Sequence, residues 1–225
     1  MHMQRINDET ILKDFLSHSD FEQCFSFPAA QYAQLFHAKA GDYIMREGEV
    51  PAYLYYLHTG RVKLYLTLSN GKVSLIDFFE APCFMGEMEL IGVQKESRAI
   101  QALGDCYCVA LPFSECKDQL LNDALFLRKL CIYLGTKNNR NVVALSQNQA
   151  FPLANRLAAF LLYASHDGYY TERHTHAAEY LGVSYRHLLH MFSIFLQNGF
   201  IAKEERGYRL VNHAALEDMA RAIEV

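Results

Sequence analysis

Side chains that can bind the edges of bases recur at helical spacing near the C-terminal end of the chain. Tyr185, Arg186 and His190 would share one face of a helix with Ser193 and Gln197. An arginine guanidinium can donate two hydrogen bonds to O6 and N7 of guanine, the commonest specific contact in the major groove of DNA. The opposite face is apolar and is expected to be buried: Leu188, Leu189, Phe192, Phe195 and Leu196. The spacing therefore predicts an amphipathic helix that offers its polar face to a major groove.

The residues around this helix indicate a helix-turn-helix. Ala178 is small enough for the crossing point of two helices, Gly182 suits the tight turn, and Ser184 can cap the second helix. Two strand-like runs come after it at 200–203 and 208–211, which predicts a β-hairpin wing. The candidate DNA-binding residues are Thr175, Ser184, Tyr185, Arg186, His187, His190, Lys203 and Arg206.

The charge of the chain restricts how it could hold nucleic acid. It carries 21 Lys and Arg against 25 Asp and Glu, a net charge of −4, which argues against a protein that coats nucleic acid through bulk charge. The window 173–209 differs, because it holds five basic and three acidic side chains with four histidines. The side chains expected to contact phosphates or loops without reading sequence are Lys203, Arg206, Arg209, His174 and His176. A pair of packed helices with no role in DNA binding is the alternative.

The N-terminal half of the chain has a different pattern. Residues 1–37 carry apolar side chains at helical spacing, which predicts short amphipathic helices that cap the next part of the chain. From Gly41 to Pro112, short runs of Tyr, Val, Ile and Leu end at Gly, Pro or Asn, which predicts a β domain of roughly eight strands. The Asn70-Gly71 pair predicts a two-residue hairpin turn. The expected fold class is therefore α+β.

One long helix is expected from Asp123 to Gln149, where Gly135 is the only glycine and proline is absent. Its apolar residues could pair with a second copy of the chain, which predicts a homodimer, and packing on the β domain alone is the alternative. Pro152 is expected to break the helix and to form a hinge. The predicted domains are 1–122 for the helices and β domain, 123–152 for the dimerisation helix and hinge, and 153–225 for the helix-turn-helix.

The six cysteines are expected to be reduced thiols in the cytoplasm, because no apolar signal segment indicates export and no apolar run is long enough for a membrane span. Cys106 and Cys108 would share one face of a strand, and Cys83 and Cys131 could join them in space. Buried cysteine is common as a small core residue, so we expect neither an iron-sulfur cluster nor another metal site. Thiol redox sensing is a minor hypothesis.

Several motifs resemble the CRP/FNR family of regulators between residues 37 and 211. They are Gly41-Asp42, Glu47-Gly48-Glu49, Leu54-Tyr55-Tyr56-Leu57, Gly60-Arg61-Val62 and the run from Phe84 to Leu90. Residues 75–87 and 178–189 look like the YeiL group within that family. The resemblance implies a cyclic-nucleotide-binding-like β-roll (a double-stranded β-helix), a dimerisation helix and a winged helix-turn-helix. It also implies double-stranded DNA and RNA polymerase as partners.

The resemblance further implies where an effector would bind. In members that bind a cyclic nucleotide, a Gly-Glu pair contacts the ribose, and an Arg followed by Ser or Thr holds the phosphate. Here the second motif reads Ser97-Arg98-Ala99, so strand alternation turns Arg98 away from the pocket unless a one-residue bulge restores it. A buried phosphate would then lack its counter-charge, so a cyclic nucleotide is not expected. The effector-pocket candidates are Gly86, Glu87, Ser97, Arg98 and Asn141, the last of which stands where the cyclic-AMP receptor carries a hydroxyl residue.

These features favour a sequence-specific DNA-binding transcription regulator that responds to an effector, with Arg186 reading bases directly. The alternative is a ligand-binding β-roll module whose helix-turn-helix makes protein contacts only, which predicts no salt-dependent affinity for DNA. An enzyme is not indicated, because no nucleophile is paired with a positioned base. The effector, the operator and the direction of regulation stay open.

Overall fold

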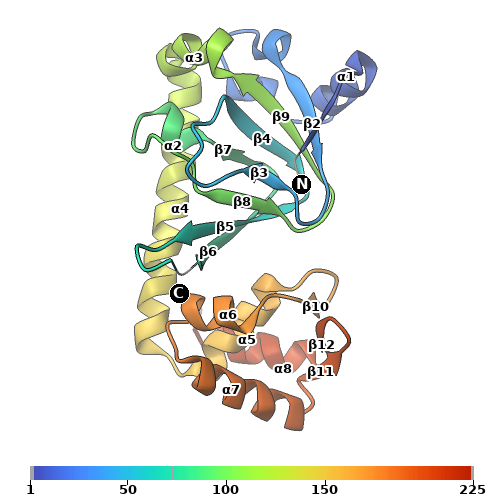
Figure 1. Ribbon diagram of the computed structural model, residues 1–225, viewed down its shortest axis with the longest axis vertical. Coiled ribbons are helices and arrows are strands. Elements are labelled where there is room, and N and C mark those ends of the chain that lie inside the picture. Colours follow the sequence, from blue (N-terminus) through green and yellow to red (C-terminus); the bar gives the residue numbers. More distant parts are fainter. Residues whose placement is uncertain (1–2, 72, 224–225) are drawn as a thin grey trace. The chain divides into compact units, whose positions relative to one another are not determined.

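The computed structural model describes residues 3–71 and 73–223, and the chain divides into two compact units, Met1–Gly135 and Thr136–Val225. The long helix α4 (Ala124–Ala150) crosses this division, so its first turns belong to the first unit and its last turns to the second (Figure 1). Within the described ranges, no helix is both long and apolar enough to cross a membrane.

The first unit is a β-roll of two antiparallel sheets (Figure 1). One sheet contains, in order across it, β1 (Gln4–Ile6), β2 (Gln34–Ala38), β9 (Cys106–Pro112), β4 (Tyr53–Thr59) and β7 (Cys83–Met85). The other contains β3 (Tyr43–Met45), β8 (Ala99–Ala102), β5 (Arg61–Thr67) and β6 (Val73–Glu80). Buried side chains from both sheets, among them Leu57, Val62 and Ile100, meet in one apolar core. The predicted β-roll is therefore confirmed.

Strand β4 shows why this part of the sequence is so apolar. Tyr55 and Leu57 face the core between the two sheets, whereas Leu54 and Tyr56 face a second core formed with the helices. Successive side chains of a strand point to opposite faces, so a strand covered on both faces reads as a continuous apolar run. The chain then passes to the other sheet at Gly60, where φ is +102° and an added Cβ would lie 2.6 Å from the Cys106 sulfur. Glycine is required at this crossing.

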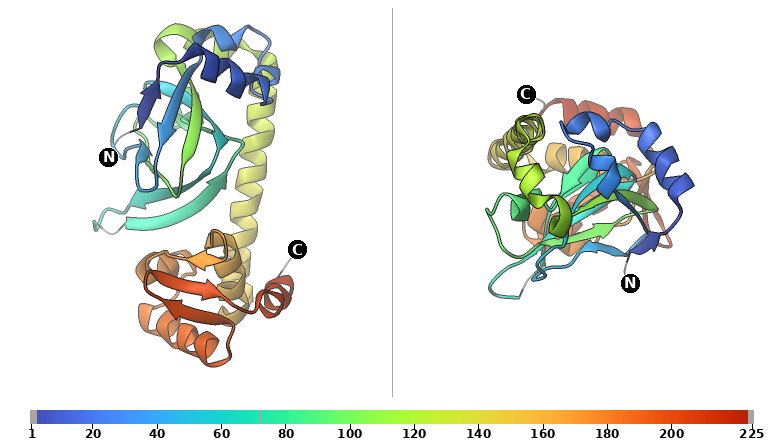
Figure 2. Two further views of the ribbon diagram at one scale, coloured as in Figure 1. Left: turned by 90° about the vertical axis from the view of Figure 1, so that its right-hand side faces the viewer. Right: turned by 90° about the horizontal axis from the view of Figure 1, so that it is seen from above.

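Two predictions for the first unit are corrected. The N-terminal residues do form helices, α1 (Glu9–Ser17), η1 (Glu22–Cys24) and η2 (Ala29–Tyr32), which Figure 2 shows in blue against the roll. They also form strands β1 and β2, because pairing with β9 outweighs the local helical spacing. The Asn70-Gly71 turn is not a two-residue turn, since Thr67 pairs with Val73 across the hairpin.

Helix α4 begins at a buried carboxylate. Asp123 is 4% exposed, and its Oδ1 accepts hydrogen bonds from the backbone N–H groups of Leu125 (2.9 Å) and Phe126 (3.2 Å). The Ser26 hydroxyl donates to Oδ1 at 2.8 Å, and the Ser26 backbone N–H donates to Oδ2 at 2.6 Å. The same residue thus caps the helix and fastens the N-terminal segment to it. The first turns of α4 then bury Phe126 and Leu130 in the helix-side core of the roll.

The second unit contains the last turns of α4 and a winged helix-turn-helix. Its further elements are α5 (Leu153–Ala164), β10 (Tyr169–Tyr170), α6 (His174–Tyr180), α7 (Tyr185–Gln197), β11 (Ile201–Glu204), β12 (Gly207–Leu210) and α8 (His213–Arg221). Strands β11 and β12 form the predicted hairpin, and β10 pairs with β12 on its other side. Helix α8 packs on α5, and Leu157, Leu188 and Leu216 are fully buried.

The corner between α4 and α5 is held by hydrogen bonds within the second unit. The Arg156 guanidinium donates to the backbone oxygen of Phe151 at 2.9 Å, to Asn148 Oδ1 at 3.1 Å and to the backbone oxygen of Leu181 at 2.6 Å. Asn148 in turn donates to the backbone oxygen of Tyr180 at 3.1 Å. The break expected at Pro152 is present, but these bonds tie it to the helix-turn-helix. The division between the compact units falls earlier, at Gly135.

Candidate nucleic-acid interface and effector site

The turn between α6 and α7 has the geometry that the sequence predicts. Gly182 adopts a φ of +63°, which suits glycine, and Ala178 is 5% exposed between the helices. The Ser184 hydroxyl oxygen accepts a hydrogen bond from the His187 backbone N–H at 3.2 Å and so caps α7. These three residues fix the direction in which α7 leaves the turn.

Helix α7 has one buried face and one exposed face. Leu188, Phe192 and Phe195 are between 0% and 2% exposed and form the buried face. The exposed residues are Tyr185, Arg186, His187, Leu189, His190, Ser193 and Gln197. The expectation that Leu189 is buried is wrong: it is 37% exposed, because it lies one residue, about 100° of helix rotation, beyond Leu188.

The cationic side chain on the exposed face of α7 carries no internal partner. Arg186 forms neither an ion pair nor a side-chain hydrogen bond with any residue in the described ranges. His187 and His190 are likewise exposed, and Tyr185 is 50% exposed. The exposed face of α7 therefore presents hydrogen-bond donors to whatever lies against it.

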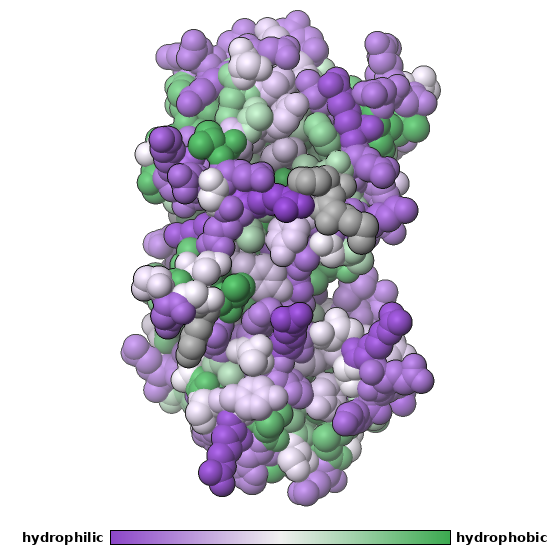
Figure 3. Space-filling model, viewed as in Figure 1, coloured by the Kyte–Doolittle hydropathy of each residue, from purple (hydrophilic) through white to green (hydrophobic). Residues whose placement is uncertain are grey.

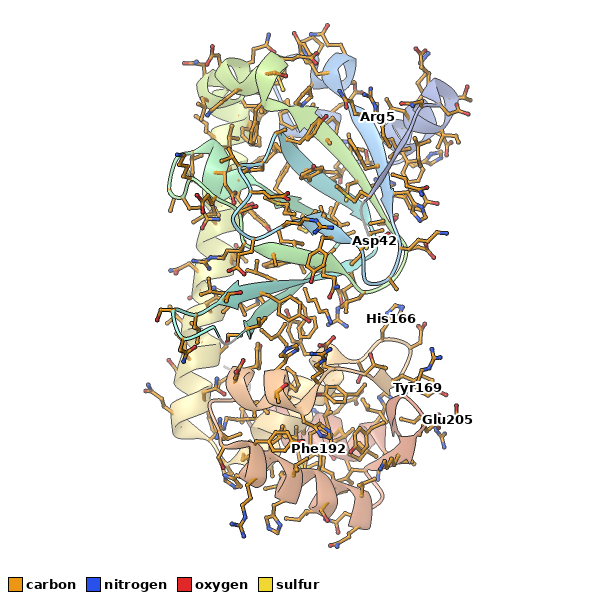
Figure 4. All side chains as sticks on the ribbon, viewed as in Figure 1. Arg5, Asp42, His166, Tyr169, Phe192 and Glu205 are labelled. Carbon is orange, nitrogen blue, oxygen red and sulfur yellow. The ribbon has the colours of Figure 1, made fainter. Side chains whose placement is uncertain are left out.

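Aromatic side chains support α7 from behind. The Phe192 ring, which Figure 4 labels inside the second unit, lies 4.4 Å from the His174 ring and 4.9 Å from the Tyr208 ring, centre to centre. Burial, and to a smaller extent the positive charge of Lys203, lowers the pKa of His174. His174 therefore packs under α7, and His176 lies 3.8 Å from the Glu172 carboxylate. Both histidines are partly buried, and the contacts expected for them with loops or phosphates stay a prediction.

The wing supplies a second group of exposed cations. Lys203 and Arg206 are exposed on and beside the β11–β12 hairpin, and neither forms an ion pair with another described residue. The sequence predicts that Arg209 acts with them, but its Nε lies 2.9 Å from Glu204 Oε1, so this charge is already paired. Thr175 is exposed on the first turn of α6. These residues can contact a phosphate backbone only if they line up with α7 on the bound duplex.

In the first unit, the Ser97-Arg98-Ala99 motif has its hydroxyl buried and its cation exposed. Ser97 is 3% exposed, and its hydroxyl donates to the backbone oxygens of Arg46 at 2.5 Å and Glu49 at 2.9 Å. Arg98 is exposed, as expected, although both residues lie just before strand β8 (Ala99–Ala102) and not in it. The buried position therefore holds a hydroxyl that is bonded to the 46–49 loop, and the neighbouring cation points outward.

The other effector-pocket candidates do not supply the missing charge. Gly86 has a φ of +88°, and Glu87 is a buried acid, 3% exposed, at the start of α2 (Glu87–Leu90). Asn141 is exposed on the part of α4 that belongs to the second unit. None of these candidates is a buried cation, and Arg98 is exposed. A buried anion needs a counter-charge, so these residues do not fit the phosphate of a cyclic nucleotide.

Five of the six cysteines pack as buried core residues. Cys83, Cys106 and Cys108 lie in the core between the sheets, whereas Cys131 is exposed and does not join them. Cys83 and Cys108 pair with Leu57 from the two neighbouring strands, so their Cα atoms lie two strand spacings, about 9.6 Å, apart. A disulfide requires Cα atoms within about 7 Å, so these two cysteines cannot form one. Burial raises the pKa of the Cys106 and Cys108 thiols, which disfavours the reactive thiolate.

The comparisons with solved structures define the fold. A family model described as "Cyclic nucleotide-binding domain" matches residues 35–123. A structure of a putative transcriptional regulator of the CRP/FNR family from Eubacterium rectale superposes with a TM-score of 0.71 at 18% identity and covers 94% of each chain. A CRP/FNR-family regulator from Thermus thermophilus gives a TM-score of 0.68 at 20% identity, covering 84% of this chain and 100% of that one.

The chain belongs to the family of the YeiL regulatory protein, and it shares its fold with solved structures of CRP/FNR-family regulators. A curated relative, the regulatory protein YeiL of Escherichia coli O157:H7, is 53% identical over 205 residues. The match covers 91% of this chain and 94% of the relative. It confirms the likeness to the YeiL group that residues 75–87 and 178–189 indicate.

Proposed function

We propose that this regulator binds duplex DNA sequence-specifically and that α7 enters the major groove. The exposed face of α7 carries the proposal, because the capped helix holds a cation and several hydrogen-bond donors that have no use inside the fold. Arg186 would read guanine through O6 and N7, with Tyr185 and His190 contacting further bases or phosphates. Lys203 and Arg206, with Thr175, Ser184 and His187, would set the register on the backbone.

A homodimer is the second part of the proposal. Helix α4 exposes apolar side chains that a monomer leaves in water: Leu125 (39% exposed), Ile132 (61%), Val142 (52%) and Leu145 (64%). Leu125 and Ile132 are seven residues apart, the spacing at which helices pair with a copy of themselves. Two paired chains would present α7 to half-sites one helical turn, about 34 Å, apart.

The response to an effector, the contact with RNA polymerase and a cytoplasmic location are proposals that rest on the family alone. The bonded hydroxyl of Ser97 and the outward Arg98 support an effector other than a cyclic nucleotide. A helix-turn-helix that contacts only protein is the rival function, and it predicts no dependence of DNA affinity on salt.

Titrations of one selected duplex and one random duplex test the DNA-binding proposal. We expect Arg186→Ala to weaken binding to the selected duplex by about 1–3 kcal/mol and to change binding to random DNA little. Arg206→Ala is the matched control. It should weaken binding to both duplexes alike, and it should reduce the slope of log affinity against log salt concentration by about one, the value of one phosphate contact. Equal losses on both duplexes for Arg186→Ala, or affinities that do not depend on salt, would contradict the proposal.

A further inference from the structure

Leu189 is a partly exposed apolar side chain at the edge of the polar face of α7. It is 37% exposed, and of its neighbours on the helix surface Tyr185, Arg186 and Ser193 are exposed, whereas Phe192 is buried. Leu188, which is fully buried, already fills the core at this level of the helix. Figure 3 shows hydrophobic surface between hydrophilic side chains along the lower edge of the second unit, where Figure 1 places α7. The exposed part of the Leu189 side chain is available to a ligand.

The major groove offers one apolar group to a protein, the C5 methyl of thymine. A leucine side chain that enters the groove without meeting a methyl would cover polar base edges, which would lose their water without gaining a hydrogen-bond partner. We propose that Leu189 contacts a thymine methyl in each half-site and is a determinant of sequence specificity. This inference rests on the proposed DNA binding through α7.

The helix geometry sets where the thymine should lie. Leu189 is three residues beyond Arg186, so the two side chains are neighbours on the helix surface. The rise between them is about 4.5 Å along the axis, close to the spacing of about 3.4 Å between stacked base pairs. The thymine is therefore expected one or two base pairs from the guanine that Arg186 reads.

Deoxyuridine provides the test, because it differs from thymine only by the missing methyl group. The probe is the tightest duplex recovered from a randomised library, in which each thymine is replaced by deoxyuridine in turn. For the unaltered dimer, replacement of one particular thymine in each half-site should weaken binding about fourfold, which corresponds to the loss of one buried methyl group. For Leu189→Ala, which changes an exposed side chain, the same replacement should have no effect.

Two further variants complete the experiment. Leu189→Met keeps an apolar side chain of similar reach and should keep the effect of deoxyuridine, which covers the case in which Leu189→Ala binds too weakly to titrate. Val211→Ala removes another exposed apolar side chain, 48% exposed, from the second unit and should leave the effect unchanged.

The possible failures are distinguishable. If the duplex binds but deoxyuridine has the same effect on the unaltered protein and on Leu189→Ala, the thymine contact is wrong and DNA binding stands. The contact is also wrong if Leu189→Met loses the effect together with Leu189→Ala. If the library yields no duplex above background at low ionic strength, the proposed function fails and takes this inference with it.

Discussion

The segment just before β8 and the exposed face of α7 make opposite use of polar side chains. In the roll, the Ser97 hydroxyl is buried and donates to two backbone oxygens of the same unit. On α7, Arg186 and His190 point away from the core and have no partner among residues 3–71 and 73–223. A polar group that is bonded inside the fold stabilises it, whereas one left in water is available to a ligand. The Ser97 hydroxyl therefore contributes to stability, and the exposed face of α7 is left available to a ligand.

The largest effect on stability is expected at Asp123, whose buried carboxylate joins α4 to the N-terminal segment. Asp123→Ala removes four hydrogen bonds to a carboxylate and should lower the free energy of unfolding of the first unit by about 3 kcal/mol. Urea unfolding measures the loss. Asp105→Ala is the control, because its carboxylate is paired with His37 but 72% exposed, and should cost less than about 1 kcal/mol.

The cost of Asp123→Ala should also depend on pH. Burial, the largest single influence, raises the pKa of Asp123, but the hydrogen bonds from Ser26, Phe126 and Leu125 prevail and hold it below the usual 3.8. The contribution is therefore present above pH 3.8 and is lost as the pH falls through the lowered value. A difference between Asp123→Ala and the unaltered chain that stayed constant below that pH would show that the carboxylate charge is not involved.

A smaller loss of stability is expected at Ser97. Ser97→Ala removes the donor to the Arg46 and Glu49 carbonyl oxygens and should destabilise the first unit by about 1 kcal/mol. DNA affinity of the folded protein should stay the same, because the hydroxyl lies in the roll. Ser193→Ala, on the exposed face of α7, should weaken DNA binding and leave the stability of the second unit unchanged. A Ser97→Ala protein as stable as the unaltered one would break the comparison.

The weakest expected effect is a pH dependence of the second unit. The pKa of His174 is lowered from 6.5, so the unfolded chain binds a proton more readily than the folded one. The stabilisation is complete above pH 6.5 and is lost as the pH falls through 6.5 to the lowered value. Thermal unfolding between about pH 8 and pH 5 should show this decline, His174→Gln should reduce it, and His190→Gln, at an exposed position, should not. An equal decline in His174→Gln and the unaltered chain would exclude His174 as its source.

The local signals in the sequence were sufficient for the helix-turn-helix. Ala178, Gly182 and Ser184 act within a few residues of one another, so their small size, positive φ and capping hydroxyl could be read from residue type and spacing. The transposed order of Ser97 and Arg98 was also informative, because adjacent side chains of an extended segment point to opposite sides. In both places the residues concerned lie close together in the sequence.

The features that the sequence missed depend on contacts between distant segments. Strands β1 and β2 exist because β9 pairs with β2, more than 60 residues away. The corner at Pro152 is held by Arg156 and the backbone oxygen of Leu181, which no local pattern indicates. The sequence analysis predicts that Leu189 is buried, because the apolar pattern alone does not distinguish which of the adjacent residues Leu188 and Leu189 faces the core. Taking the spacing from Phe192 and Phe195 back to Leu188 would have identified Leu189 as the exposed one.

The most direct test of the account is a binding measurement with modified guanines. In the duplex selected by this regulator, each guanine is replaced in turn by 7-deazaguanine, which lacks the N7 acceptor. The account predicts one guanine per half-site at which the unaltered protein loses about 1 kcal/mol of binding free energy while Arg186→Ala loses nothing. The same loss in both proteins, or no loss in either, would contradict base reading by Arg186 and with it the assignment of α7 as the reading helix.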